Sequence, residues 1–276
     1  MSQTCSRTIL MTGAAGIVGS ALRPVLRAQY GTLLLSDVRP VIDLEPNESF
    51  EPCDVADLAK LTELARKADG IIHLGGMVGP DYSFTEVLHP NIVGSYNVFQ
   101  AAWVAKITNV VYASSHHVVG FVPRGQKIDD QTAHQPDSHY GLSKAFGESA
   151  GAYFAHKFGL NVLSIRIGYV GEAVSDERRV HTWISPRDLA QLIEMGLTEP
   201  NLGYEVVYGT SDNPSPFFDN TNAFRLGYRP KDSSRDHVTD PALLEEKPDS
   251  NTVAGACVGG RFASVGYQGK QWPRET

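Results

Sequence analysis

The chain has 276 residues, of which 42% are hydrophobic and 20% are charged, and its formal net charge is −7. This composition predicts one globular unit and argues against nucleic-acid binding, which requires a basic face. The first apolar run, Ile9–Met11, is too short for a signal-peptide core or a membrane span. Cys5, Cys53 and Cys257 lack the spacing of a disulfide framework or a zinc site, so we expect a reducing, cytoplasmic setting.

Apolar runs and helical spacings alternate along the first part of the chain. Short apolar runs predict strands over residues 7–12, 32–36, 70–74, 109–113 and 161–167. Apolar residues at helical spacing predict helices over residues 16–28, 57–68, 84–106 and 140–157. Because alternating strands and helices form parallel βαβ units, we predict an α/β fold with a Rossmann-type, doubly wound parallel sheet.

The alternation weakens after residue 168. Ser185–Asp188 resembles a capping box and predicts a helix to residue 197, and a strand is expected over residues 204–208. We expect residues 1–168 to form a dinucleotide-binding domain that carries the catalytic residues. Residues 169–276 are expected to form a small C-terminal substrate-side lobe and a tail within the same structural unit.

A glycine-rich turn follows the first predicted strand and opens the first predicted helix. Its candidate cofactor residues are Gly13, Gly16, Ile17, Val18 and Gly19. Glycines at this spacing allow a pyrophosphate to approach the backbone, and the helix N-terminus supplies N–H donors. The turn therefore predicts a dinucleotide site, although an ordinary strand-to-helix turn can carry the same glycines.

Asp37 lies 18 residues after Gly19, at the end of the second predicted strand. A carboxylate there can bind both ribose hydroxyls and repels a 2′-phosphate, which favours NAD over NADP. Arg39 is the competing signal, because a nearby arginine could accommodate that phosphate. A turn aspartate after a strand is the purely structural alternative.

Two further segments are candidates for contact with the cofactor. Asp54 and Val55 fall where an adenine ring would lie, and Asp54 could accept a hydrogen bond from the adenine amino group. A helix-capping role explains Asp54 equally well. Leu74, Gly75 and Gly76 end the third predicted strand and could pass beneath the middle of the cofactor.

Tyr140 and Lys144 are four residues apart, so on a helix their side chains lie on one face. A neighbouring lysine lowers the pKa of a phenol, which can then take a proton from an alcohol. The same spacing also occurs by chance on exposed helices. Ser115 follows the fourth predicted strand, where its hydroxyl could bind the reacting oxygen; a turn after a strand is the alternative for Ser114 and Ser115.

These motifs together resemble an extended short-chain dehydrogenase/reductase of the NAD-dependent epimerase/dehydratase superfamily. Within it, the chain is most similar to the uronate dehydrogenases, in stretches 72–76, 113–117, 140–148, 166–168 and 226–232. The resemblance implies oxidation of the C1 hydroxyl of cyclic galacturonate or glucuronate to a lactone, with NAD as the acceptor. A related group of sugar-phosphate dehydrogenases shares many of these stretches.

The resemblance also implies roles for single residues. Tyr140 is the base that removes the hydroxyl proton, and Lys144 lowers its pKa and holds the ribose. Ser115 binds the reacting oxygen, and Asn91 supports the site from the long helix. Arg178 matches an arginine that binds the substrate carboxylate, for which a planar guanidinium is suited. If the match is shifted by one residue, Arg179 takes this role instead. A solvated, charged loop without a binding role is the purely structural alternative.

Three candidate substrate-binding residues depart from the uronate dehydrogenases. His116 replaces an asparagine, Val78 replaces a serine, and Tyr169 replaces a sugar-contacting serine. His117 matches a family histidine and could contact the sugar. A site loses affinity when a hydroxyl-binding partner disappears, so the identity of the sugar stays open. No ligand grouping predicts a metal.

Two other classes of function remain as alternatives. The protein could be a dehydrogenase of another sugar or a sugar phosphate, or a nucleotide-sugar epimerase or dehydratase with the same cofactor core. Epimerases and dehydratases commonly carry a larger C-terminal lobe than this chain leaves room for. A non-catalytic NAD-binding protein has no need of Ser115, Tyr140 and Lys144 together. Apart from its sugar substrate, we expect no nucleic-acid or membrane partner, and we expect a homo-oligomer.

Overall fold

The computed structural model describes residues 5–269. At its centre is a seven-stranded sheet of parallel neighbours in the order β3-β2-β1-β4-β5-β6-β9. Its strands are β1 (Cys5–Thr12), β2 (Tyr30–Ser36), β3 (Glu48–Phe50), β4 (Gly70–His73), β5 (Asn109–Ser115), β6 (Asn161–Ile167) and β9 (Tyr204–Gly209). The predicted α/β fold with a Rossmann-type parallel sheet is therefore confirmed.

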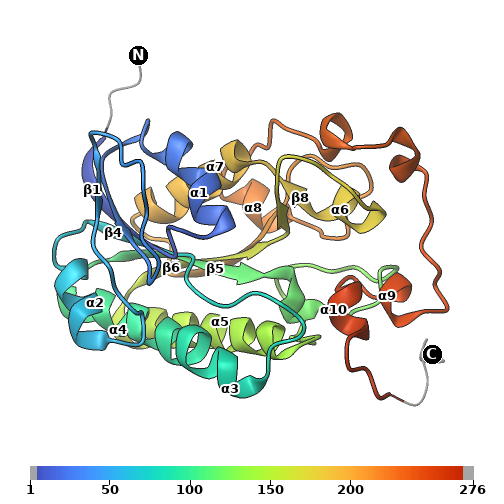
Figure 1. Cartoon of the computed structure of the whole chain (residues 1–276), viewed down its shortest axis with the longest axis horizontal. Helices are drawn as coiled ribbons and strands as arrows, with labels where there is room; N and C mark the ends of the chain where they lie inside the picture. Colours follow the sequence, from blue (N-terminus) through green and yellow to red (C-terminus); the bar gives the residue numbers. More distant parts are fainter. Residues whose placement is uncertain (1–4, 270–276) are drawn as a thin grey trace.

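Helices cover both faces of this sheet, so that the molecule has three layers (Figure 1). α1 (Ile17–Leu26) and α7 (Pro186–Thr198) pack on one face. α2 (Leu58–Ala65), α4 (Gly94–Ala105) and α5 (His139–Phe158) pack on the other face. Each helix buries its apolar side against the sheet, as parallel strands that are covered on both faces require.

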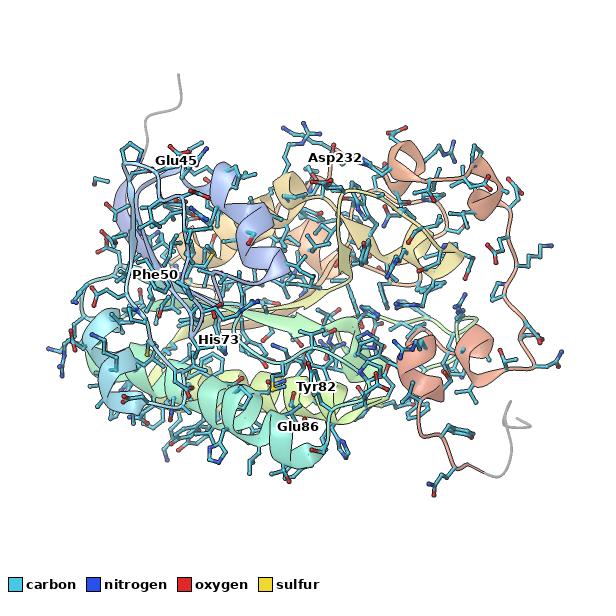
Figure 2. All side chains as sticks on the ribbon, in the orientation of Figure 1. Glu45, Phe50, His73, Tyr82, Glu86 and Asp232 are labelled. Atoms are coloured by element: carbon cyan, nitrogen blue, oxygen red, sulfur yellow. The ribbon has the colours of Figure 1, made fainter. Side chains whose placement is uncertain are left out.

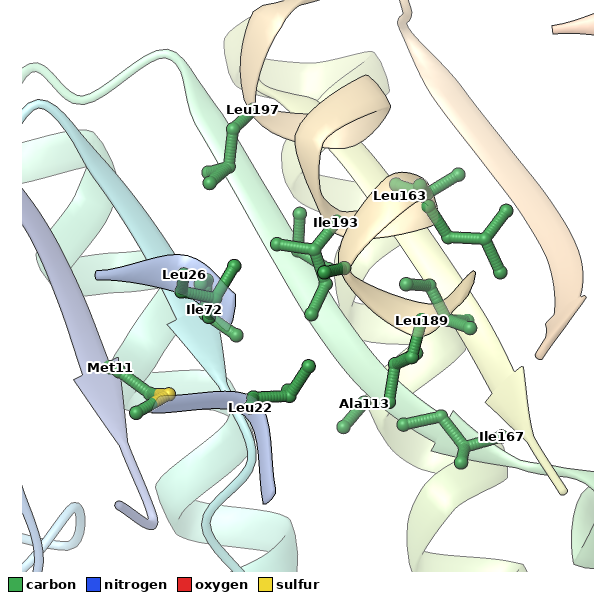
Figure 3. Packing of buried hydrophobic residues seen from close by; sticks show 14 of the residues in the cluster. Met11, Leu22, Leu26, Ile72, Ala113, Leu163, Ile167, Leu189, Ile193 and Leu197 are labelled. Carbon is green, nitrogen blue, oxygen red and sulfur yellow. The ribbon is translucent and has the colours of Figure 1, made fainter. Parts of the chain in front are cut away.

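The alternation of side chains along each strand supplies both apolar layers. Met11 of β1 packs with the α1 and α7 side of the sheet, whereas the preceding Leu10 packs with the opposite side. Figure 3 shows the first of these layers, to which α1 contributes Leu22 and α7 contributes Ile193. This packing fixes the strand ends on which the site is built.

The chain reverses its direction of travel across the sheet at β1. β2 and β3 lie on one side of β1, and the next strand, β4, pairs with the other side. Connections that leave in opposite directions open a crevice at the carboxyl ends of the two central strands. This crevice is the place where a doubly wound sheet binds a ligand.

A small lobe lies beyond the carboxyl ends of β5 and β6. It contains β7 (Tyr169–Val170), α6 (Glu177–Thr182), β8 (Trp183–Ile184), η3 (Ser234–His237), η4 (Pro241–Leu244), α9 (Val253–Ala256) and α10 (Arg261–Ser264), whereas α8 (Thr221–Arg225) packs beside β9. The last part of the chain returns to the loop after β5, where Gly259 N–H donates to the carbonyl oxygen of Gly120 (2.9 Å). α9 and α10 therefore lie next to the end of the sheet that carries the crevice (Figure 1).

The structure differs from the sequence expectations in three places. The helix expected over 84–106 is divided into α3 (Phe84–Val87), a π-helix η1 (Leu88–Val93) and α4, because Pro90 has no N–H for the α-helical pattern. β3 was not expected, since three residues give no periodic signal. The central layers also extend past the boundary expected at residue 168. The sheet includes β9, and α7, which packs on it, likewise comes from the later part of the chain. Within residues 5–269, no helix is long and apolar enough to cross a membrane.

Candidate active site

The turn between β1 and α1 leaves no space for a side chain at Gly13 or Gly19. Gly13 has a φ of +76°, and a Cβ there would lie 2.5 Å from the backbone nitrogen of Gly75. A Cβ on Gly19 would lie 2.7 Å from the carbonyl oxygen of Gly13. α1 begins at Ile17, and its first turn borders a cavity. A cradle of bare backbone at a helix N-terminus fits the pyrophosphate of a dinucleotide.

The Asp37 carboxylate lies against the same turn. Its Oδ2 accepts a hydrogen bond from the Ala15 N–H (3.0 Å), and its Oδ1 accepts one from the Arg39 N–H (3.0 Å). The Arg39 guanidinium donates to the Ala15 carbonyl oxygen (2.8 Å), and 67% of its side chain is exposed. The residue that favours NAD and the residue that could favour NADP therefore lie at the same end of the turn.

A cavity of about 360 Å³ lies at the carboxyl ends of β1, β4, β5 and β6. The predicted cofactor residues that border it are Gly13, Gly16, Ile17, Val18, Gly19, Leu74 and Gly76. The predicted catalytic and substrate residues that border it are Val78, Ser115, His116, His117, Tyr140, Lys144, Tyr169 and Arg178. The predicted residues that do not border it are Asp37, Asp54, Val55, Gly75 and Asn91. Most of the predicted site residues therefore border one cavity.

Tyr140 and Lys144 lie on α5, and both are buried against the end of β5. Burial raises the pKa of Tyr140 to about 12, although a hydrogen bond with Ser115 lowers it. Burial lowers the pKa of Lys144 to about 8, and its Nζ donates to the carbonyl oxygen of Ala113 (2.7 Å). The Tyr140 pKa is therefore raised, contrary to the lowering expected from Lys144, because burial disfavours the charged phenolate.

The two serines at the end of β5 have different surroundings. Ser115 borders the cavity beside Tyr140. Ser114 Oγ instead donates to Glu148 Oε1 (2.5 Å), and Glu148 is paired with Arg166 (3.0 Å). Both serines border the cavity, but the Ser114 hydroxyl is bonded within a buried ion-pair network, which leaves Ser115 as the predicted partner of a reacting oxygen.

Asn91 lies behind the cavity on η1 and fixes its wall. Its side chain accepts from the Met77 N–H (2.7 Å) and donates both to the Met77 carbonyl oxygen (2.9 Å) and to Ser143 Oγ (2.9 Å). These bonds tie the loop that carries Gly76 and Val78 to the helix that carries Tyr140. The supporting role that the resemblance implies for Asn91 stays a prediction.

Asp54 and Val55 lie between β3 and α2 and do not border the cavity. Asp54 is exposed, and its Oδ1 accepts from the Ala56 N–H (2.9 Å). Asp57, not Asp54, provides the side-chain cap of α2, since it accepts from the Lys60 N–H (3.0 Å). The capping alternative for Asp54 is thus excluded, and its contact with adenine stays a prediction.

His116 and His117 follow β5 and point to different partners. His116 Nδ1 lies 3.1 Å from the Ile167 carbonyl oxygen, and its Nε2 lies 2.9 Å from Arg178 Nη1. His117 Nδ1 lies 2.7 Å from Asp137 Oδ2. Burial lowers the pKa of both rings well below the ordinary histidine value, so both are neutral.

Arg178 and Arg179 both border the cavity from α6, with different bonding. Arg179 pairs with Asp176 (3.2 Å) and lies over the Tyr169 ring at 4.2 Å. Within residues 5–269, no carboxylate lies within the 4.0 Å ion-pair distance of Arg178. Of the two arginines, Arg178 is therefore the one whose charge no carboxylate of the described residues neutralises.

The chain matches the description of the NAD dependent epimerase/dehydratase family over residues 9–203, which is more than half of its length. It belongs to this family. NAD is therefore the cofactor, and the glycine turn, the α1 N-terminus and Asp37 are the parts of this family member that fit it. The resemblance noted from the motifs is confirmed.

Individual relatives are similar over nearly the whole chain. Uronate dehydrogenase from Pseudomonas putida is 40% identical over 269 residues, which cover 96% of this chain and 99% of that protein. Glucuronic acid dehydrogenase from Chromohalobacter salexigens has a structure with a TM-score of 0.87 and 38% identity, covering 93% of this chain and 96% of that one. A mutant of uronate dehydrogenase from Agrobacterium tumefaciens complexed with NAD has a TM-score of 0.87 and 33% identity, covering 94% and 97% of the two chains.

Two residues of this family member join the site without a signal in the sequence. Phe262 of α10 borders the cavity and stacks on His117 with ring centroids 3.8 Å apart. Asp137 is buried beneath His117, and burial raises its pKa to about 6. Gly120 and Gly259 leave room for this carboxylate, which a Cβ at either position would overlap.

A third buried histidine lies behind the cofactor side of the site. His73 ends β4 in the interior of the molecule (Figure 2), and its Nδ1 lies 2.7 Å from Thr12 Oγ1. Its Nε2 has no hydrogen-bond partner among the described residues. Burial, with a smaller effect of Lys144, lowers the pKa of His73 to about 3. The imidazole is therefore neutral at physiological pH. Within the same described range, no cluster of metal-binding side chains is present.

Proposed function

We propose that this protein oxidises the C1 hydroxyl of a cyclic hexuronate, glucuronate or galacturonate, to a lactone. Arg178 carries the proposal. This side chain is half-buried and borders the cavity, and no carboxylate of the described residues pairs with it. A half-buried guanidinium without an anion can take one from a ligand, and a uronate carboxylate matches its planar fork.

Ser115 and Tyr140 supply the chemistry at the other end of the sugar. In the proposed reaction, the C1 hydrogen leaves as hydride and the hydroxyl proton passes to the Tyr140 oxygen, while the Ser115 hydroxyl donates to the reacting oxygen. NAD, when bound, supplies the hydride acceptor. The base is the phenolate, and burial raises the pKa of Tyr140 to about 12. We therefore expect the oxidation to accelerate as the pH rises above neutrality.

A sugar phosphate is the second candidate substrate, because Arg179 also borders the cavity beside Arg178. Two guanidinium groups suit a phosphate dianion as well as a carboxylate. Against this, Asp176 already neutralises Arg179. Epimerisation or dehydration of a nucleotide sugar remains the alternative that produces no net NADH.

The proposal is tested by NADH formation with a panel of sugars. Purified protein should reduce NAD with glucuronate and galacturonate, and far less with glucose, galactose or glucose 6-phosphate. Arg178→Gln should remove most of the preference for the uronates while it leaves the low rate with neutral sugars. No NADH from any uronate, or a higher efficiency with the phosphate, would rule the proposal out.

We also propose a cytoplasmic homo-oligomer. Cys53 is buried and free, as a reducing compartment permits. α4 and α5 expose large apolar side chains, including Trp103 (44%) and Tyr153 (48%). Such a patch supports burial against a second copy. Sedimentation velocity should give at least a dimer, and a monomer at micromolar concentration would contradict this part.

A further inference from the structure

The hydrogen bonds of His116 determine which of its nitrogens carries the proton. A carbonyl oxygen only accepts, so Nδ1, which lies 3.1 Å from the Ile167 carbonyl oxygen, carries the N–H. Nε2 is then a lone pair, and it accepts from Arg178 Nη1 at 2.9 Å. His116 is thus a neutral acceptor that fixes the guanidinium without neutralising it.

Gly260 holds the same side chain from the opposite direction. Its φ is +61°, and a Cβ there would lie 2.6 Å from Arg178 Cδ and 2.7 Å from Arg178 Nε. The glycine therefore lets the C-terminal segment lie directly on the arginine stem. This segment and the arginine helix are joined by Arg124, which pairs with Glu177 (2.7 Å) and donates to the Cys257 carbonyl oxygen (3.2 Å).

We propose that His116 and Gly260 form a clamp that holds the Arg178 fork toward the cavity and thereby determines the preference for a carboxylate-bearing sugar. The clamp rests on the proposed function, and it assigns to His116 a positioning role instead of a contact with the sugar. A neutral clamp suits this purpose, because a carboxylate in place of His116 would pair with Arg178 and compete with the substrate.

Substitutions of His116 can separate its two nitrogens. Gln places an amide oxygen near the Nε2 position and can still accept from Arg178, whereas Asn reaches only the Nδ1 position. Phe keeps the ring volume and removes both polar groups. We therefore expect His116→Gln to preserve the fork, and both His116→Asn and His116→Phe to release it.

The test measures glucuronate affinity by calorimetry on protein saturated with NADH, so that no turnover occurs. His116→Phe and His116→Asn should weaken binding about tenfold, and His116→Gln should stay within about twofold of the unaltered protein. In an Arg178→Ala background, His116→Phe should have no further effect, because it acts only through the arginine. NADH affinity should be the same throughout.

Two glycines of the C-terminal segment provide a matched pair that leaves His116 intact. Gly260→Ala should weaken glucuronate binding, because the new methyl group displaces Arg178. Gly266 has a similar φ of +67° with nothing within 4 Å of its Cβ position, so Gly266→Ala should not weaken it. Equal effects of the two substitutions would attribute the loss to backbone strain and overturn the clamp.

Three other results also decide the matter. An equal cost of His116→Phe with and without Arg178 would mean that His116 touches the sugar itself, and the clamp would be wrong. Unaltered protein that binds glucuronate but forms no NADH would refute the proposed oxidation, while the affinities would still test the clamp. Protein that does not bind glucuronate would overturn both.

Discussion

The two halves of the site are built by different means. The cofactor half consists mainly of backbone and glycine, supplied by residues adjacent in the chain at the turn between β1 and α1. The sugar half consists of side chains from separate segments, among them His116, Tyr140, Tyr169, Arg178 and Phe262. The first half depends on the absence of side-chain atoms, and the second depends on buried polar groups that hold one another in place.

This difference predicts which kind of substitution affects each half of the site. Substitutions in the cofactor half should act through steric overlap, and their cost should follow the space at each position. Substitutions in the sugar half should act through hydrogen bonds, protonation and charge, with little effect on NAD binding. The following experiments test that division, beginning with the largest expected effect.

Tyr140→Phe removes the proposed proton acceptor and keeps the ring. We expect kcat with glucuronate to fall roughly 10³-fold, because general base catalysis is lost, while the Kd for NAD changes little. Tyr153→Phe on the exposed side of the same helix should be without effect. A Tyr140→Phe enzyme within tenfold of the original kcat would show that another group accepts the proton.

Gly13→Ala tests the steric half of the comparison. The methyl group would lie 2.5 Å from the Gly75 nitrogen at a φ of +76°, so we expect a loss of about 3 kcal/mol in the free energy of unfolding. Gly159 has a φ of +74° but nothing within 4 Å, so Gly159→Ala should cost only about 1 kcal/mol. Urea titration measures both, and equal losses would indicate backbone strain alone.

Asp37→Ser examines the choice of dinucleotide. Loss of the carboxylate should lower kcat/KM with NAD by about thirtyfold and raise the relative use of NADP, since it removes the ion-pair partner of Arg39 and the charge that repels a 2′-phosphate. Asp69 also accepts from a backbone N–H, that of Thr8 (2.8 Å), but at the amino end of the sheet. Asp69→Ser should leave the NAD to NADP ratio unchanged. An unaltered ratio after Asp37→Ser would instead place cofactor choice elsewhere.

The buried histidines predict a loss of stability in acid. His73, His116 and His117 are neutral in the folded chain, so below the ordinary histidine pKa of 6.5 only the unfolded chain takes up these protons. Asp137 works in the opposite direction: its raised pKa of about 6 gives stability in acid that is lost as the pH rises through that value. The three histidines outweigh this single carboxyl group.

His73→Asn should therefore flatten the pH dependence by about 1.4 kcal/mol per pH unit below 6.5. Urea titrations at pH 7.5 and 5.5 measure it, and His89→Asn on the exposed surface is the control. If His73→Asn keeps the original pH dependence, His73 titrates normally and its burial does not govern stability.

The fold and the cofactor half could be predicted from the sequence because their requirements are local. Strand and helix periods, the glycines after β1 and Asp37 at the end of β2 are all visible within short windows. β3 escaped prediction because three residues carry no period, and the π-helix escaped because Pro90 alters hydrogen bonding without ending the helical pattern.

The sugar half was predictable only as far as its residues belong to motifs. Tyr140, Ser115 and Arg178 were named correctly as neighbours of one cavity. Sequence spacing says nothing of burial, so the rise in the Tyr140 pKa was missed. Asp137 and Phe262 reach the site through tertiary contacts between distant segments, which no local pattern reports.

The central claim is that this cavity takes hydride from C1 of a carboxylate-bearing sugar, and one competition tests it directly. Equal amounts of [1-²H]glucuronate and unlabelled glucose are supplied with NAD, and the NADH is examined by mass spectrometry for deuterium. The account predicts mostly deuterated NADH, despite the slower transfer of the heavier isotope. Predominantly unlabelled NADH, or none at all, would contradict it.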